Sequence, residues 1–587
     1  MQIDFLDWAI IGLFFLVSLG IGLYTARRAG NSFNEYFLSG RNMPWWLLGV
    51  SMVATTFSAD TPNLVTDFVR QNGIAKNWEW WAFCLTGMLT VFVYAKLWRR
   101  SGIKTDLEFY ELRYSGPQAR FLRGFRAIYL GVFFNVCIMA TVILAGIKLG
   151  LVLLGWTPTQ TIVIAGSITV AYTLLGGLRG VILTDFFQFG LAMLGMIAAC
   201  IFIINLPEVG GLSSLLTHET IVPKLDFIPS ISNGEAFIPI FLLPIAVQWW
   251  SVWYPGAEPG GGGYVVQRML SAKDEKNAIG ATFLFNIAHY ALRPWPWILI
   301  ALASLLVFPT VEDMAIAFPN APAELVKDDL AFPDMLIKLP SGLLGFVTAC
   351  LIAAFMSTIS THLNWGSSYL VNDFYVRFIK PEATEKEMVN VGRIGVVIMF
   401  ILAALLAPIL QNAGRAFDLL LQIGAGTGLL FILRWFWWRI NALAEIVAMV
   451  VSFLVACVVF VVNFKVARLS SEAALLIGVG TTTVSWLLTA LLTKPTDSAT
   501  LKSFYQTIRP HAFGWRTFLA KEGIEEIPTS GFSRELMCMF AGVFLVYGTL
   551  FGTGFLLYGR IAPALIGLSV AVLASIVVAR NWSVVLE

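Results

Sequence analysis

Hydroxyl side chains are concentrated in the middle of one long apolar segment of the chain. Ser357, Ser360 and Thr361 stand at positions i, i+3 and i+4, so a helix would place them on one face. Ala354, Ser357 and Thr358 form a second, overlapping triplet. Hydroxyls and free backbone carbonyls can replace the hydration shell of a small alkali cation. The alternative is ordinary packing, because Ser and Thr in membrane helices also bond to the carbonyl four residues back.

Another apolar segment, residues 44–70, is interrupted near its centre by polar residues and a proline. Pro62 has no N–H and its ring clashes with the carbonyl four residues earlier, so a helix would break around Ser58. The neighbouring Asp60 would cost about 2.5–3.5 kcal/mol at the bilayer centre, so it should have a partner. Inverted-repeat transporters bind their substrates at such interruptions. The simpler alternative is a proline kink, which membrane helices tolerate.

A matching interruption lies at the end of the apolar segment 237–254. There Gln248, Trp249 and Trp250 are followed a few residues later by a Pro-Gly pair. This segment opens the second group of helices just as the first interrupted segment opens the first group, five helices earlier. The offset predicts a five-plus-five repeat over 44–437.

Two further charged residues lie inside apolar segments. Asp185 stands several residues into its segment, so its carboxylate either pairs with a cation or lies near enough to the interface to be hydrated. Arg293 would present a planar guanidinium, which can bind a carboxylate through two parallel hydrogen bonds. An acidic sugar or another organic anion is therefore an alternative to a neutral solute.

Only membrane-spanning helices can position these residues. The chain has 587 residues, of which 58% are hydrophobic and 13% charged, whereas soluble domains have about 25% charged residues. A spanning helix needs about 20 mostly apolar residues. Fifteen segments qualify, with approximate bounds 7–25, 44–70, 77–97, 124–154, 160–175, 181–205, 237–254, 278–308, 340–370, 389–410, 416–437, 442–464, 472–493, 535–558 and 562–580.

The connections between these segments predict an orientation and an energy source. Basic residues predominate in alternate connections, which places the N-terminus outside and the C-terminus in the cytoplasm. The longest cytoplasmic connection, 494–534, is too short for an ATPase domain, and the chain has no GxxxxGK[ST] loop. We therefore expect an ion gradient, and not ATP, to drive transport.

Composition excludes several other classes of protein. A net charge of +3 with dispersed basic residues argues against nucleic-acid binding. The four histidines are scattered and HExxH is absent, which argues against an intramembrane metalloenzyme, and we expect no cofactor. A nutrient sensor that acts through a partner stays open as an alternative.

Four motifs carry a family resemblance. They are Gly-Gly-x6-Thr-Asp-x2-Gln at 176–188, Thr-x2-Glu-Phe-x3-Arg-Tyr at 105–114, Gln-Arg-Met-Leu-Ser-Ala-Lys at 267–273, and 353–364 followed by Asn-Asp-Phe-Tyr at 372–375. With these motifs the chain resembles the sodium/solute symporter family, whose members transport sugars, inositol, sialic acid, proline and other solutes. The resemblance implies an all-α membrane protein with a LeuT-type five-plus-five inverted repeat, one extra N-terminal helix and about four extra C-terminal helices.

The expected organisation follows from this resemblance. An extra N-terminal helix and loop occupy 1–43, the first repeat 44–205, an external loop 206–236, the second repeat 237–437, and the extra C-terminal helices 438–587. We expect a monomer in the bacterial inner membrane, whose partners are sodium ions, a small solute and the lipid bilayer.

The resemblance also implies two sodium sites. The site common to the family would use the backbone carbonyls of Ala54, Phe57 and Ala354 with the hydroxyls of Ser357 and Thr358. Some members hold a second sodium ion. The residues at its positions here would be Asp185, Ser357, Ser360 and Thr361, each of which has a suitable oxygen.

Solute binding is expected around Glu79, which corresponds to a glutamate that binds sugar hydroxyls in sugar-transporting members. It lies in the sequence Trp-Glu-Trp-Trp, where indole faces could pack on the C–H surface of a polyol while the carboxylate accepts hydrogen bonds. Thr61 stands where sugar-transporting members have a glutamine. The other expected residues are Asp60, Gln248, Trp249, Trp250 and Arg293. The alternative interpretation is an interfacial belt of aromatic residues with a hydrated Glu79.

Overall fold

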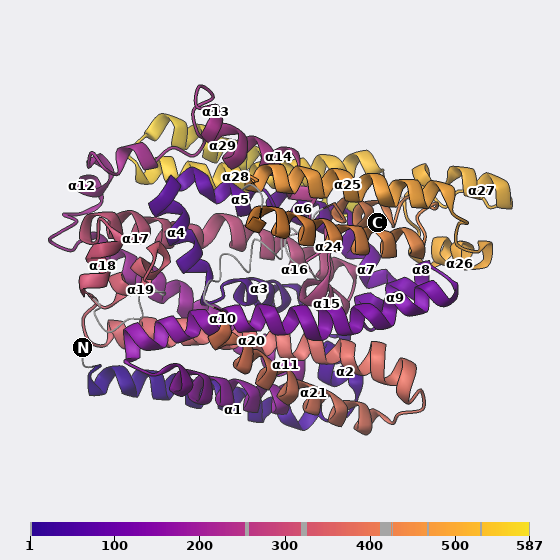
Figure 1. Cartoon of the computed structure of the whole chain (residues 1–587), viewed down its shortest axis with the longest axis horizontal. Helices are drawn as coiled ribbons and strands as arrows, with labels where there is room; N and C mark the ends of the chain where they lie inside the picture. Colours follow the sequence, from indigo (N-terminus) through magenta and orange to yellow (C-terminus); the bar gives the residue numbers. More distant parts are fainter. Residues whose placement is uncertain are drawn as a thin grey trace.

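The computed structural model describes residues 3–252, 257–317, 326–410, 424, 426–465, 469–528 and 531–585. All secondary-structure elements in these residues are helices, and the long helices run side by side along the longest axis of the molecule (Figure 1). A helix satisfies its own backbone hydrogen bonds, which a segment surrounded by lipid must do.

Eleven helices of the described residues are long and apolar enough to cross a membrane. Their bounds are Phe5–Arg27, Ile74–Ser101, Gly116–Leu154, Pro158–Ile204, Glu275–Val307, Leu343–Ile379, Glu385–Ile409, Ala442–Asn463, Ser471–Leu492, Phe532–Leu557 and Ile561–Ser583. Two shorter apolar helices, Trp45–Thr56 and Gly234–Trp250, correspond to the two interrupted segments. Residues 416–423 and 425 of the expected span 416–437 lie outside the described residues, and the rest of this span contains α23 (Gly428–Leu433).

The expected spans 160–175 and 181–205 form one continuous element, α11 (Pro158–Ile204), which Gly177 divides. Gly177 has φ 52° and ψ −157°, and a Cβ there would lie 2.7 Å from the backbone oxygen of Tyr36. Tyr172 and Asp185 would lie about 20 Å apart on a straight helix. Their side chains instead bond to the adjacent residues Met356 and Ser357, so the chain reverses direction at Gly177. Two antiparallel spans were correctly expected here, although no loop separates them.

The first interrupted segment forms two short helices, α3 (Trp45–Thr56) and α4 (Thr61–Asn72). Pro62 lies in the first turn of α4, where its missing N–H costs no hydrogen bond. The Thr61 hydroxyl donates to the Thr56 carbonyl across the break at 3.2 Å. The structure confirms the expected break.

The second interrupted segment is also divided. A set of short helical turns runs from α13 (Gly234–Phe237) through α14 (Leu243–Ala246) to the 3-10 turn Gln248–Trp250. Its second half is α15 (Gly263–Ser271). Both halves of the chain therefore contain a discontinuous helix.

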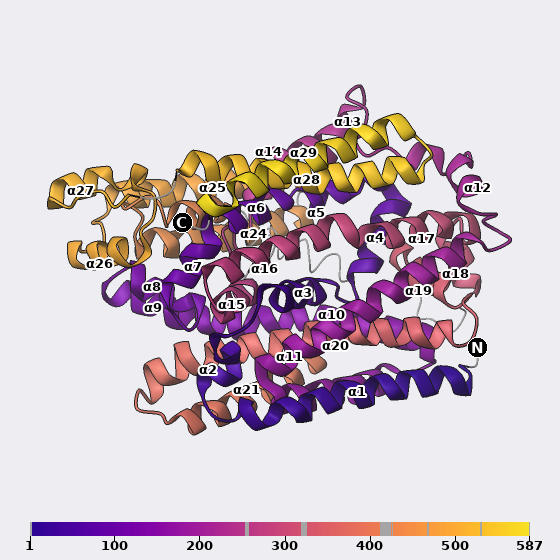
Figure 2. The same cartoon turned by 180° about the vertical axis from the view of Figure 1, so that it is seen from behind.

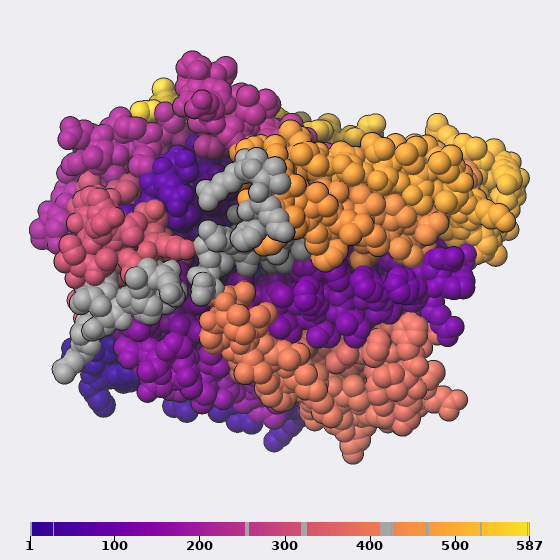
Figure 3. All heavy atoms as spheres, in the orientation of Figure 1, coloured from indigo at the N-terminus to yellow at the C-terminus, as the bar shows by residue number. Residues whose placement is uncertain are grey.

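Around these breaks the helices form a central group and a periphery. α11 packs against α3, α20 (Leu343–Tyr369) and α1 (Phe5–Ala29), while α28 (Phe532–Leu557) and α29 (Ile561–Val585) pair at one edge. Figure 2 shows the α28–α29 pair along one side and α1 along the other. The pair α24 (Ala442–Lys465) and α25 (Ser471–Leu492), drawn in orange, covers part of the surface in Figure 3. These outer helices expose large apolar side chains, including Leu16, Val458 and Ile566, as a lipid-facing surface requires.

The two ends of the helix bundle differ. The N-terminus lies at the same end as α12 (Leu212–Thr217) and α18 (Val311–Ala317), which belong to the connections 206–236 and 309–339 (Figures 1 and 2). At the opposite end lie α26 (Ser498–Ile508) and α27 (Arg516–Glu522), from the connection 494–534. The connections 206–236 and 309–339 therefore lie at one end of the bundle and the connection 494–534 lies at the other, as the orientation expected from the sequence requires.

Candidate functional site

The break in the first discontinuous helix meets the hydroxyl-rich middle of α20. The Thr358 hydroxyl lies 2.9 Å from the carbonyl of Thr55 and 3.1 Å from that of Ala354. Because α3 ends at Thr56, the carbonyls of its last turn have no continuing helix to satisfy them. Within this turn the Ala54 carbonyl accepts a hydrogen bond from the Phe57 N–H at 3.1 Å. The structure thus brings the residues expected for the common sodium site to one place, from two helices distant in sequence.

Asp185 lies next to this contact between α3 and α20 and accepts a hydrogen bond from each helix. Its Oδ1 accepts a hydrogen bond from the Ser357 hydroxyl at 2.6 Å, and its Oδ2 accepts one from the Ser51 hydroxyl at 2.5 Å. Ser357 therefore donates its single proton to Asp185, which leaves the lone pairs of its oxygen for a cation. Both side chains are fully or almost fully buried.

Arg268 is a candidate site residue that the sequence did not single out. Its Nη2 lies 3.7 Å from Asp185 Oδ2 and donates to the Thr361 hydroxyl at 2.7 Å. Its Nε donates to the Ser51 hydroxyl at 3.2 Å, and the side chain is fully buried. Two residues expected at the second sodium site thus already contact a guanidinium. The Gln-Arg motif was visible in the sequence, but nothing there indicated which carboxylate the arginine meets.

The remaining residue expected at the second sodium site is differently engaged. The Ser360 hydroxyl donates to the Ser357 carbonyl of its own helix at 3.0 Å. Thr361 also contacts the Thr55 hydroxyl at 3.0 Å, so α20 and α3 are joined at two levels.

On the other side of the break lies a second cation, Arg293. Its Nη1 donates to the Thr56 hydroxyl at 3.2 Å and its Nε to the His289 carbonyl at 3.2 Å. The guanidinium lies 5.2 Å from the centre of the Trp297 ring and 6.0 Å from that of Trp80. A cation at the C-terminal end of α3 also offsets the negative end of the helix dipole.

Several buried polar atoms at the break have no hydrogen-bond partner among the described residues. They are Ser58 Oγ, Asp60 Oδ1 and Asn63 Oδ1. Buried polar atoms in folded proteins are nearly always bonded. The Ser58 hydroxyl and the Asp60 carboxylate also interact with each other. Asp60 therefore stays an expectation for the solute set.

Glu79 and Gln248, expected from opposite halves of the chain, lie next to each other. The Gln248 amide donates to the Glu79 carbonyl at 2.8 Å. The Glu79 side chain forms an ion pair with Lys76 and is 31% exposed. Trp80 connects this region to the break, because its ring stacks on Tyr290 at 5.7 Å and also lies beside Arg293.

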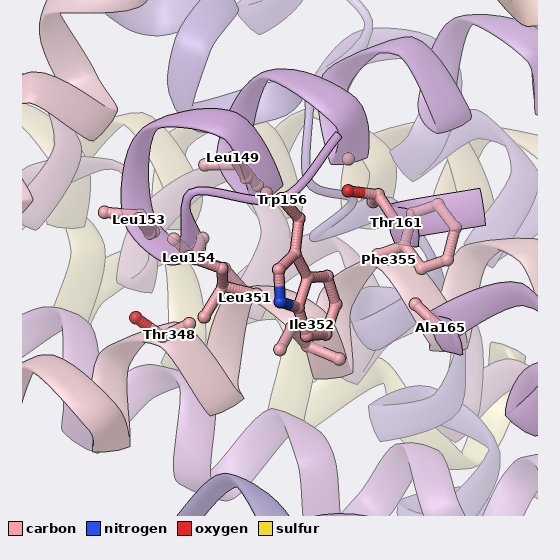
Figure 4. A pocket seen from close by; sticks show the side chains of 12 residues that line it. Leu149, Leu153, Leu154, Trp156, Thr161, Ala165, Thr348, Leu351, Ile352 and Phe355 are labelled. Carbon is pink, nitrogen blue, oxygen red and sulfur yellow. The ribbon is translucent and has the colours of Figure 1, made fainter. Parts of the chain in front are cut away.

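The two tryptophans of the expected solute set, Trp249 and Trp250, are partly buried, and the Trp250 ring N–H donates to the Ala246 carbonyl at 3.0 Å. A cavity of about 30 Å³ lies elsewhere, between the end of α10 (Asn135–Leu149), the first half of α11, and α20 (Figure 4). Its lining is apolar apart from Thr161 and Thr348, and no expected solute residue contributes to it. This cavity does not have the polar groups that a hydrophilic solute needs.

Two discontinuous helices that contact oxygen-bearing side chains inside a bundle of apolar, membrane-length helices are typical of gradient-driven membrane transporters. The profile of the sodium:solute symporter family matches residues 36–452, and the chain belongs to this family. It is a transporter and not an enzyme, and it carries out sodium-coupled symport.

The relatives of the chain agree with this assignment. A sodium/mannose cotransporter from Bos taurus is 28% identical over 472 residues, covering 75% of this chain and 76% of the relative. A sodium/glucose cotransporter from Vibrio parahaemolyticus is 26% identical over 472 residues, covering 77% and 84% respectively. Among solved structures, a Na⁺-coupled sialic acid symporter in a substrate-bound outward-open state matches with a TM-score of 0.68 and 21% identity, over 84% of this chain and all of that chain. This likeness shows the LeuT-type fold.

Proposed function

We propose that the chain imports a small neutral polar solute, a sugar or polyol, together with sodium. The main observation behind the proposal is the hydrogen bond from the Thr358 hydroxyl to the Thr55 carbonyl, at the end of the first half of the broken helix. The names of the relatives support a sugar, since they include mannose and glucose cotransporters. The common sodium site would be formed by the carbonyls of Ala54, Phe57 and Ala354 and the hydroxyls of Ser357 and Thr358.

The solute would bind on the other side of the break, between the two halves of the chain. Glu79 and Gln248 supply polar groups, and Asp60 supplies a buried oxygen without a partner among the described residues. The faces of Trp80 and Tyr290 supply the flat apolar surfaces on which a sugar ring can pack. This combination of few polar groups and aromatic walls is typical of sites for small molecules.

An acidic solute is the second candidate, and Arg293 favours it. No carboxylate lies within 4.0 Å of this buried guanidinium in the part of the chain that the structure describes. Its bonds to Thr56 and to the His289 carbonyl nevertheless occupy it at the end of α3. We therefore place the neutral solute first.

We also propose the expected setting for this transporter. The protein would lie in the bacterial plasma membrane with its N-terminus outside, as a monomer with the two repeats at 44–205 and 237–437. Support comes from the connections 206–236 and 494–534, which lie at opposite ends of the bundle.

The test is uptake of radiolabelled mannose, glucose and sialic acid into proteoliposomes, each with an inward sodium or potassium gradient. We expect sodium-dependent uptake of a neutral sugar. Equal uptake in the two salts would refute sodium coupling, and sodium-driven uptake of sialic acid alone would favour the acidic solute. Sodium-dependent binding without any flux would indicate a sensor.

A further inference from the structure

Two adjacent aspartates, Asp328 and Asp329, form ion pairs with two different helices. Asp328 Oδ1 accepts a hydrogen bond from Arg70 Nε of α4 at 2.8 Å, and Asp329 Oδ2 accepts one from Lys148 Nζ of α10 at 2.7 Å. Both aspartates belong to the 3-10 turn Asp328–Leu330, which continues directly into α19 (Ala331–Leu336). Because the two residues are neighbours in one turn, a single movement of this segment would break both ion pairs.

Arg70 also joins α4 to the end of α17 (Pro294–Val307). Its Nη1 donates to the Ser304 hydroxyl at 3.1 Å and to the Phe308 carbonyl at 3.0 Å. α19 packs against both α4 and α17, and it lies toward the end of the bundle that carries the N-terminus (Figures 1 and 2). The two ion pairs therefore hold residues 328–336 against α4, α10 and α17 at this end.

α4 leads from the break to these ion pairs. It begins at the break with Thr61, and Arg70 is nine residues further on, which is about 14 Å along a helix. Asn63, Thr66 and Arg70 are spaced by three and four residues, so they share one face. Asn63 Oδ1 and Thr66 Oγ1 are buried and have no hydrogen-bond partner among the described residues. Since buried polar atoms are nearly always bonded to protein or water, this face is suited to a hydrated path.

The two ion pairs combine buried cations with partly hydrated carboxylates. Arg70 and Lys148 expose 1% and 8% of their side chains, whereas Asp328 and Asp329 expose 24% and 23%. Such pairs are easier to separate than pairs between fully buried groups, because water can replace the lost contact at the carboxylate. They can therefore hold the segment closed and still break during a transport cycle.

We propose that Asp328 and Asp329 form an outer latch, made of the ion pairs Arg70–Asp328 and Lys148–Asp329. The outer latch closes the polar face of α4 to the aqueous phase, and it opens when both ion pairs break. In the proposed orientation, the open path connects the solute site at the break with the outside. The inference rests on the proposed function, because a transporter needs such a path to open and close.

Thr66→Cys places a thiol on this face, between the break and the outer latch. The rate of its reaction with a water-soluble maleimide would be measured on the purified protein. The Thr66 side chain is fully buried, so the reaction should be slow while the latch is closed. Adding Asp328→Asn or Asp329→Asn breaks one ion pair and should raise the rate about tenfold or more. The chain without Thr66→Cys, with its six native cysteines, gives the background.

Lys338→Gln is the matched control, because it breaks an ion pair at the same end and leaves the outer latch intact. Lys338 Nζ lies 3.5 Å from Glu208 Oε1, and this pair is largely exposed. The labelling rate at position 66 should not change in this variant. Unchanged rates in both aspartate variants would overturn the proposal. An equal rise at the native cysteines would also overturn it, because the cause would then be general unfolding.

Exchanging the charges of one pair gives a second measurement if a single variant does not fold. Lys148 and Asp329 are suited to it, because the side chain of each forms hydrogen bonds only with the other among the described residues. Lys148→Asp alone should give rapid labelling, and Lys148→Asp with Asp329→Lys should restore the slow rate. Rapid labelling in the double variant would overturn the role of this pair. Labelling needs neither sodium nor a solute, so a failure of the outer latch is distinct from a failure of sodium-dependent uptake.

Discussion

The guanidinium of Arg268 lies 3.7 Å from the carboxylate of Asp185, and both side chains are fully buried. The pair joins α15, the second half of the second discontinuous helix, to the second half of α11. Thr361 and Ser51 accept further hydrogen bonds from the same guanidinium. The positive charge thus lies among the residues that were expected to hold a second sodium ion.

We expect a sodium-to-solute ratio of one, because a second sodium ion at Asp185 would have to displace Arg268. One sodium ion moving through about 100 mV releases about 2.3 kcal/mol, and a tenfold gradient adds about 1.4 kcal/mol. One ion then supports about 500-fold accumulation of a neutral solute, and two support more than about 10⁵-fold. Reversal potentials in proteoliposomes measure the ratio directly. A ratio of two would show that Arg268 moves away, and Asp185→Asn should then lower the ratio.

The same pair predicts a large change in stability. Arg268→Gln leaves the buried Asp185 carboxylate without its charged partner, which should destabilise the protein by about 3–5 kcal/mol. Asp185→Asn in the same chain removes that unpaired charge and should restore most of the loss. Thermal unfolding of the two single variants and the double variant gives the coupling. Additive effects would contradict a direct interaction.

Sodium affinity should depend on Thr358 and not on a similar threonine elsewhere in α20. Thr358→Ala removes a hydroxyl that lies at the broken end of α3, so the sodium concentration for half-maximal transport should rise about tenfold. Thr348 lies on the same helix, is equally buried, and lines the apolar cavity. Thr348→Ala should leave the sodium dependence unchanged. Equal effects of the two variants would point to general damage to the helix.

Solute affinity should depend on Glu79. If its carboxylate accepts hydrogen bonds from solute hydroxyls, Glu79→Gln should raise the half-saturating solute concentration about tenfold or more, with a much smaller change for sodium. Lys76→Gln removes the ion-pair partner of Glu79 but keeps the carboxylate, so solute binding should be better preserved. Uptake kinetics at fixed sodium distinguish the two. No change in either variant would support the aromatic belt instead.

Stability should fall with rising pH because of Asp334, which lies outside the spans in α19 (Ala331–Leu336). Burial raises the pKa of its carboxyl from 3.8 to about 8, and Asp329 adds to this while Arg70 opposes it. The folded state therefore binds more protons than the unfolded state between about pH 4 and about pH 8, so this contribution is lost across that range as pH rises.

Asp334→Asn should remove this dependence. Compared with the wild type, the variant should therefore gain more stability at about pH 9 than at about pH 5. Melting temperatures of the wild type and the variant across this range provide the measurement. Asp226→Asn, at an exposed position, is the matched control and should follow the wild type. Parallel pH profiles for the wild type and Asp334→Asn would contradict the assignment.

The sequence by itself determined the class of protein, the approximate spans and the position of both breaks. Apolar length and the lack of charge require membrane helices, and the proline at position 62 ends a helix by local sterics. The spacing of Ser357, Ser360 and Thr361 determined which hydroxyls share a face of α20. These properties depend on neighbours along the chain.

Only the tertiary structure decided which distant groups meet. The reversal at Gly177 brings Asp185 to Ser357, and the path of the second discontinuous helix brings Arg268 to both Asp185 and Thr361. The physical reason is that charge pairing and hydrogen bonding depend on distances of a few ångströms between helices, which helical periodicity within one segment does not specify.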